Sequence, residues 1–213
     1  LPLRFIVPNA VAGEVGAITT SGILALGMDD DLTTQAIRLY DATYTLITTI
    51  ASLLGAIPHG LTTNMSTRFY VTGAGIATLK SFDTAGVVGA TTWTLAVSGA
   101  RAIGVRQDDT ILYYADGTVG GTVKLWDLVN DVALSDLAAG IALYSVQDNL
   151  LVLSDGTIIV AYKGGAGSLD LNVRAYSAAG VLLLTYAIGD VAQDVRLAMA
   201  VDDPNSFWLW TKN

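Results

Sequence analysis

The stretch "TVKLWDLVND", residues 122–131, decides how this chain folds. Val123, Leu125 and Trp126 are apolar or aromatic, as is typical of a β-strand. Asp127 and the Asn130-Asp131 pair that follows are typical of a tight turn. The stretch therefore predicts a strand that ends in a turn. Whether it belongs to a larger unit depends on whether it repeats.

The same pattern occurs four times along the chain. Each copy has an apolar residue, a basic residue, any residue, an aromatic residue and then Asp or Ser, at residues 37–41, 79–83, 123–127 and 173–177. The basic residues, which lie 42, 44 and 50 residues apart, are Arg38, Lys80, Lys124 and Arg174. A second series of strand-like apolar runs starts at residues 22, 67, 110, 157 and 206. Two series with similar spacing indicate an internal repeat of about 45 residues.

The turns between these runs repeat as well. Asp, Asn and Gly gather before each run of the second series and again after it, which is ordinary hairpin-turn chemistry. A fourth apolar run follows the aromatic motif, as at 45–51 and 181–187. Each repeat then holds about four short antiparallel strands, which is the pattern of a β-propeller blade.

The "VKLWD" motif resembles the third strand of a degenerate WD40-like blade. The Gly-His dipeptide that opens typical WD repeats is absent, because the only histidine is His59, in "IPHG". The end of the chain, "DDPNSFWLWTK" (202–212), is similar to propeller repeats of bacterial surface and phage virion proteins. This resemblance implies a structural or binding role at a virion or cell surface.

We therefore predict an all-β fold, a β-propeller of four-stranded antiparallel blades with about five blades visible and the last one incomplete. A single domain is expected over residues 1–213, with blades at approximately 15–51, 60–97, 101–137, 141–187 and 195–213. The aromatic of each repeat is predicted to fill the gap between neighbouring blades. These aromatics are Tyr40, Phe82, Trp126 and Tyr176.

The fifth repeat lacks its aromatic motif. Residues 3–7, "LRFIV", align with a fourth strand and are expected to close this blade, which leaves its third strand missing. The chain is either a segment of a longer propeller or an open ring that takes a strand from another chain. The absence of an initiator Met favours a segment.

Composition excludes several classes of function. A net charge of −8 and a pI near 4.3 argue against binding nucleic acid. With no Cys, disulfides and thiolate metal sites are excluded. The longest apolar runs, such as 49–57 and 181–189, are too short for a membrane-spanning helix, and no signal peptide is predicted.

No stretch carries a recognisable catalytic or metal-binding constellation, so we predict no catalytic residues, no metal and no cofactor. His59 stands alone, and the acidic "MDDDLT" (28–33) lacks the pattern of a calcium loop. The Gly-rich "KGGAGS" (163–168) lacks the Lys-Ser/Thr order of a phosphate loop. Asn64-Met65-Ser66 is a formal glycosylation sequon.

Propeller topology does place some loops on one face. The loops after each second strand and those between blades share a face, and loops on a rigid scaffold are the usual place for binding. The binding-face candidates on these loops are Asp30, His59, Asp116, Lys163 and Asp190.

The sequence thus favours a non-enzymatic binding or structural scaffold module that contacts protein partners or copies of itself. Two alternatives stay open. One is a propeller enzyme, such as a lyase, hydrolase or quinone-dependent dehydrogenase, with its site at the axial channel. The other is a glycan-binding lectin, which needs an aromatic pocket repeated between blades. An extracellular or virion-associated location is favoured.

Overall fold

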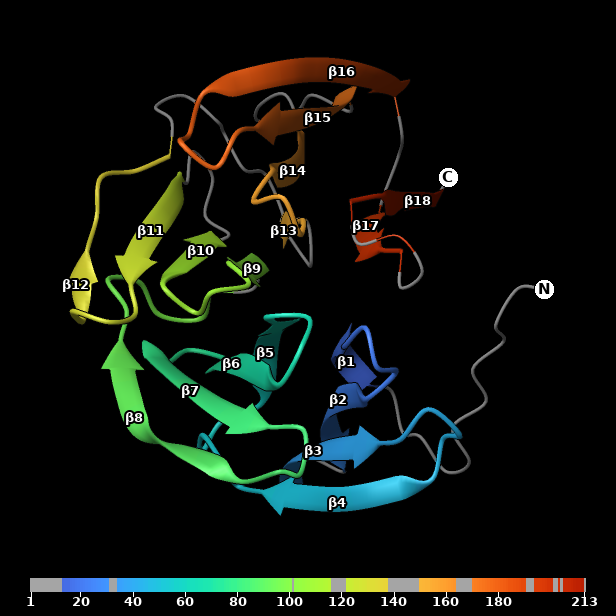
Figure 1. The fold of residues 1–213 in the computed structure, drawn as a ribbon, viewed down its shortest axis with the longest axis vertical. Coiled ribbons are helices and arrows are strands. Elements are labelled where there is room, and N and C mark those ends of the chain that lie inside the picture. Colours follow the sequence, from blue (N-terminus) through green and yellow to red (C-terminus); the bar gives the residue numbers. More distant parts are fainter. Residues whose placement is uncertain are drawn as a thin grey trace.

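The computed structural model describes residues 13–30, 34–100, 102–115, 122–137, 150–163, 170–190, 194–200, 203 and 205–212. These residues form β-strands and turns, and the all-β fold class predicted from the repeat is confirmed. Four antiparallel sheets of four strands and one sheet of two strands stand around a common centre, like the blades of a propeller (Figure 1). Within these ranges no helix is long and apolar enough to span a membrane.

We number the sheets as blades in chain order. Blade 1 contains β1 (Gly13–Ile18), β2 (Leu24–Asp30), β3 (Thr34–Tyr40) and β4 (Leu46–Ala51). Blade 2 contains β5 (Pro58–Thr63), β6 (Arg68–Gly73), β7 (Thr78–Asp83) and β8 (Val88–Thr94). Blade 3 contains β9 (Ala102–Val105), β10 (Ile111–Ala115), β11 (Val123–Asp127) and β12 (Val132–Ala133). Blade 4 contains β13 (Leu150–Val152), β14 (Ile158–Lys163), β15 (Asp170–Tyr176) and β16 (Leu182–Asp190). Blade 5 contains β17 (Asp194–Met199) and β18 (Phe207–Lys212).

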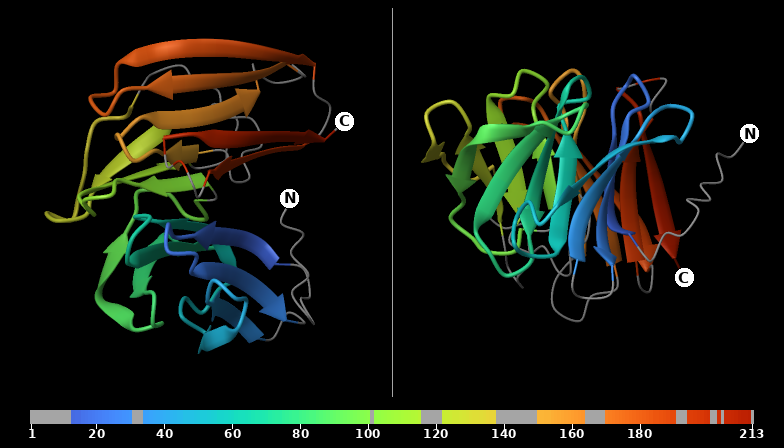
Figure 2. Two further views of the ribbon diagram at one scale, coloured as in Figure 1. Left: turned by 45° about the vertical axis from the view of Figure 1, so that its right-hand side comes forward. Right: turned by 90° about the horizontal axis from the view of Figure 1, so that it is seen from below.

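Strand order is the same in every blade. The first strand is innermost, and successive strands pair outward, so that β4, β8, β12 and β16 form the rim (Figure 1). The first strands contact one another in the order β1, β5, β9, β13 and β17. Seen from the side, the strands run between two faces that carry the connecting loops (Figure 2). The two series of runs in the sequence are the second and third strands.

Four apolar clusters hold the blades together, one at each junction between consecutive blades. Blades 1 and 2 meet at a cluster that includes Ile37, Leu39, Phe69 and Phe82. Equivalent clusters join blades 2 and 3, blades 3 and 4, and blades 4 and 5. Because both faces of a blade are packed in this way, the inner strands are apolar on both sides.

The repeated aromatics fill these junctions, as predicted. Phe82, Trp126 and Tyr176 each belong to the cluster that joins their own blade to the preceding one. Phe82 also stacks on Phe69, with ring centroids 5.2 Å apart. Tyr40 is buried as well.

The Asp or Ser after each aromatic closes the turn between the third and fourth strands. Asp83 Oδ1 accepts hydrogen bonds from the backbone N–H groups of Ala85 (2.9 Å) and Val87 (2.8 Å). Asp41 and Asp127 accept backbone hydrogen bonds in the same turn of their blades, and Ser177 Oγ accepts one from Val181. The motif therefore encodes one packed aromatic and one capped turn.

One expectation concerns residues outside the described ranges, namely the pairing of residues 3–7 with blade 5. In the described part of the chain, blade 5 has two strands, β17 and β18.

Candidate functional site

The structure describes the side chain of only one of the five predicted binding-face residues. Asp116 lies outside the described residues. Asp30, Lys163 and Asp190 end β2, β14 and β16, but their side chains are outside what the structure describes. His59, in β5, is the one candidate with a described side chain. The grouping of all five therefore stays a prediction.

His59 lies at a β-bulge in the innermost strand of blade 2, where the register with β6 shifts between Pro58 and Gly60. Its Nδ1 is 3.1 Å from the carbonyl oxygen of Gly99, so a ring with a proton on Nδ1 donates to that oxygen. Gly99 takes a φ of +69°, and its N–H donates to Ile76 O at 2.8 Å. His59 thus fastens the loop between blades 2 and 3 to blade 2.

Glu14 takes the same register position in blade 1. The pairing of β1 with β2 shifts between Gly13 and Val15, as the pairing of β5 with β6 does at His59. Sequence reasoning missed this correspondence. The sequence contains a signal for it, because its only Glu and its only His are separated by 45 residues, which is the length of one repeat.

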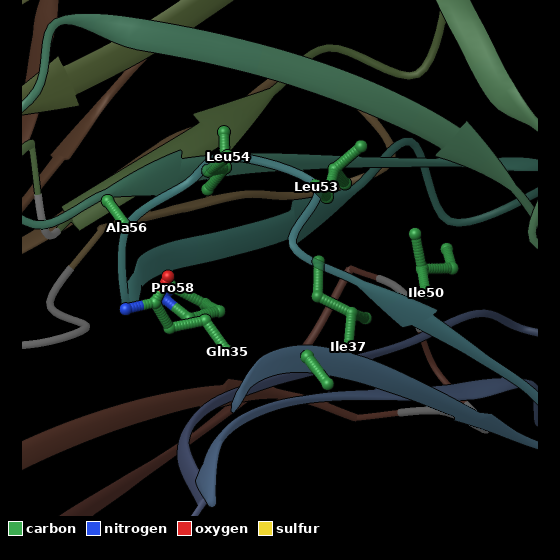
Figure 3. Close-up of a pocket in the computed structure, with 8 residues that line it drawn as sticks. Gln35, Ile37, Ile50, Leu53, Leu54, Ala56 and Pro58 are labelled. Atoms are coloured by element: carbon green, nitrogen blue, oxygen red, sulfur yellow. The ribbon is translucent and has the colours of Figure 1, made fainter. Parts of the chain in front are cut away.

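A narrow apolar recess lies between the outer strands of blade 1 and the linker to blade 2 (Figure 3). Ile37, Ile50, Leu53 and Leu54 line it, with Pro58 at the start of β5. It encloses about 170 Å³, including the part open to solvent. Small-molecule sites usually measure about 300–1,000 Å³, so this recess is a packing gap and not a ligand pocket.

The turns between first and second strands join neighbouring blades by hydrogen bonds. The N–H and Oγ1 of Thr20 both donate to Met65 O at 2.8 Å. Asn64 Nδ2 donates to Asp109 Oδ2 at 3.1 Å, again one repeat of 45 residues away. The Asp155 N–H donates to Asn205 Oδ1 at 3.2 Å. Each contact links one blade to the next, so these turns reinforce the ring.

Asn64 shows why the sequon is not an open acceptor. Its side chain is buried, and its Oδ1 accepts from the N–H groups of Ser66, Thr67 and Arg68. Its Nδ2 is used in the bond to Asp109. Glycosylation would require this turn to open, because both ends of the amide are occupied.

Asp109 is a partly buried titratable group at the junction of blades 2 and 3. Burial raises the pKa of its carboxyl above the ordinary value, although Arg68 Nη1 lies 3.8 Å from Oδ2. The residue also takes a left-handed φ of +57°, which Asn tolerates as well as Asp. Burial also raises the pKa of the neighbouring Tyr70. The folded structure therefore disfavours the ionised form of Asp109 relative to the unfolded chain.

Asp109→Asn is expected to raise the free energy of unfolding at pH 7. A raised folded-state pKa contributes stability below the unfolded pKa of about 3.9, and that contribution is lost as pH rises through the folded pKa. The gain over wild type should therefore shrink as pH falls from the raised folded pKa to about 4, and it should be absent below that. Urea unfolding of both chains across the acid range measures this difference.

Asp127→Asn is the matched control, with the opposite sign. Hydrogen bonds from Asn130 hold the pKa of Asp127 below its usual range, so its ionised form favours the fold. This variant should lose stability at pH 7, with the loss fading in acid. A destabilised Asp109→Asn at pH 7 would show that the ionised Asp109 stabilises the junction.

Trp208 marks a blade face that no neighbouring blade covers in the described residues. Counted from the turn between β17 and β18, Trp208 and Ala198 are the second pair of opposite residues. The residues at this position in blades 1 to 4 pack against the next blade and are almost fully buried. They are Ala25 (0% exposed), Tyr70 (1%), Tyr113 (1%) and Ile159 (3%), whereas Trp208 is 71% exposed.

Across the described ranges, no three His, Asp or Glu side chains come together as ligands for a metal ion. The described surface instead carries exposed apolar side chains, among them Trp208 and several residues of the rim strand β16. The uncovered face at Trp208 and the rim beside it are therefore the candidate functional site.

Comparison with known proteins agrees with the fold and leaves the function open. No protein-family model matches the chain, and no curated protein matches it. Among solved structures, hydrazine synthase of Kuenenia stuttgartiensis superposes with a TM-score of 0.65 at 13% sequence identity. The match covers 95% of this chain and 56% of that chain, so this chain spans a little over half of its length. At such low identity the likeness shows a shared fold alone.

Proposed function

We propose that this chain is a non-enzymatic binding and scaffold module that contacts proteins through uncovered blade surface. The observation that carries the proposal is the 71% exposure of Trp208 at a position that every other blade buries. An exposed tryptophan on the face of a sheet leaves a large apolar side chain in water, and tryptophan is enriched at the centre of protein-binding surfaces.

The shape of the uncovered blade face favours a protein as the partner. A blade face is shaped to pack against another β-sheet, as the four apolar clusters of this molecule do. The net charge of −8 disfavours nucleic acid as the partner. The degenerate WD40-like motif and the phage-like C-terminal pattern support a virion or cell-surface setting.

A second copy of the chain is the simplest protein to test. Every copy carries the same uncovered face, so two copies can pair about a two-fold axis. We expect the wild-type sedimentation coefficient to rise with concentration between about 1 and 100 μM, because burying Trp208 removes apolar surface from water. Trp208→Ser should abolish that rise.

Tyr44→Ser is the matched control, since Tyr44 is also an exposed aromatic but lies on the turn of blade 1. It should associate like wild type. A wild-type chain that stays monomeric throughout, or a Trp208→Ser chain that associates equally well, would contradict contact through this face.

A further inference from the structure

We infer that the rim of blades 1 to 3 is a docking surface for an extended segment of another protein that is rich in aliphatic and basic residues. The surface, called the rim belt below, is formed where the turn of each blade leads into its fourth strand. It consists of Leu46 and Ile47 of blade 1, Val87 and Val88 of blade 2, and Val129 and Val132 of blade 3. The inference rests on the proposed binding function and adds a surface that is separate from Trp208.

The rim belt is exposed although its blades have described neighbours. Blade 2 packs against blades 1 and 3, and blade 3 packs against blades 2 and 4. Val87, Val129 and Val132 are nevertheless 65%, 71% and 47% exposed. They lie at or next to β8 and β12, which form the outer edge of their sheets (Figure 1). Their exposure therefore follows from their place on the rim, whatever the number of blades.

The aliphatic residues of neighbouring blades lie close to one another around the rim. Gly86, the residue before Val87, lies against Thr48 of β4 in blade 1. In the same way, the backbone oxygen of Leu128 accepts a hydrogen bond from Trp93 Nε1 of β8 at 3.1 Å. Each turn thus brings its own exposed valine to the fourth strand of the preceding blade, and the three groups form one apolar surface.

One carboxylate per blade accompanies this apolar surface. Asp41, Asp83 and Asp127 begin the turns into the fourth strands, and the ion pairs formed between described residues do not include them. Hydrogen bonds from Thr43 lower the pKa of Asp41, and those from Asn130 lower the pKa of Asp127. Both carboxyl groups are therefore ionised at neutral pH, and the rim belt is apolar and negatively charged.

This combination selects the class of partner. Aliphatic side chains of the partner would cover the valines and leucine, and its Lys or Arg side chains would complement the carboxylates. A second copy presents the same negative rim, and the net charge of −8 adds to the repulsion between copies. An anionic membrane surface is disfavoured for the same reason. The belt also repeats on three blades, so it fits a partner that offers several such segments or binds in several copies.

The outer strands favour an extended segment over other shapes. The sequences of β4 and β8, "LITTIA" and "VGATTWT", contain no charged residue and no proline, which commonly protect the edge of a sheet. Within the described residues each of these strands pairs with its third strand alone. A bulge between Lys80 and Phe82 interrupts the β7–β8 pairing, but Thr92–Thr94 are in regular register. The outer backbone groups of this part can pair with an added strand.

The probe is a labelled synthetic peptide of about eight residues in which Val and Lys alternate, long enough to form one strand. Fluorescence anisotropy with the full chain should show binding with a Kd on the order of 100 μM. A peptide with Ser in place of Val tests the apolar contribution, and one with Glu in place of Lys tests the charge. Each should bind at least about tenfold more weakly.

Hydrogen exchange followed by NMR locates the peptide on the rim. Saturating peptide should slow exchange of backbone amides in both β4 and β8. Val87→Ser combined with Val88→Ser should remove this effect in β8 and keep it in β4, so blade 1 serves as the control within the same molecule. Both valines are exposed, so this variant keeps its fold, which its unfolding midpoint verifies. Trp208→Ser is the second control and should bind the peptide like wild type.

Four results would overturn the inference. They are the absence of binding, equal binding of the Ser–Lys peptide, unchanged protection of β8 in the valine variant, and amides of β8 that are already protected before the peptide is added. The last result would show that the rim is covered within this chain. Self-association through Trp208 is measured separately, so a chain that associates there but ignores the peptide keeps the scaffold function and loses only the rim belt.

Discussion

Trp93→Ala is expected to lower the free energy of unfolding by about 3–5 kcal/mol, the range for truncating a large buried aromatic. Trp93 is buried between blades 2 and 3, where its ring lies 5.9 Å from that of Tyr70. Its Nε1 donates to Leu128 O at 3.1 Å, so truncation also leaves a buried carbonyl without its donor. Urea unfolding followed by circular dichroism measures the loss.

Tyr186→Ala is the matched control, because Tyr186 takes the same register position in blade 4. With 62% of its surface exposed, its truncation should change the free energy of unfolding by no more than about 0.5 kcal/mol. Equal losses for the two variants would mean that the side chain of Tyr186 is covered in solution.

The order of strands was predictable because two series of motifs, one for the second strands and one for the third strands, recur at similar spacing. The aromatic, the Asp and the turn residues recur at one spacing, and each has a local cause in packing or capping. Phe82 and Asp83 illustrate this, since one fills a junction and the other closes the adjoining turn. A sequence pattern can therefore locate strands and the residues between blades.

Contacts between turns of different blades were not predictable in the same way. Asn64 looked like a turn residue or a sequon, yet it fastens its own turn and bonds to Asp109 of the next blade. The bulges at Glu14 and His59 depend on how two strands register, which no single strand encodes.

The exposure of Trp208 could not be predicted from the sequence either. Its strand has the apolar pattern of a core strand, and most aromatics on such strands are expected to be buried. Trp208 is exposed because burial depends on a neighbouring blade and not on the strand itself. The candidate site thus consists of residues with core-like patterns and uncovered surroundings, which only the arrangement of blades reveals.

Gly86→Ala is expected to cost about 2–5 kcal/mol, and it tests directly whether turns hold consecutive blades together. Gly86 has a φ of +86°, where any Cβ costs about 1–2 kcal/mol. The added Cβ would also collide with Thr48 Cγ2 of blade 1, and overpacking of this kind adds about 1–3 kcal/mol.

Gly55→Ala separates these two causes. Gly55 has a φ of +66°, but a Cβ added there would meet no atom within 4 Å. It should therefore lose only the conformational part, about 1–2 kcal/mol. A larger loss at Gly86, measured by urea unfolding of both variants, isolates the packing of the blade 2 turn on blade 1. Equal losses would show that this turn yields without cost.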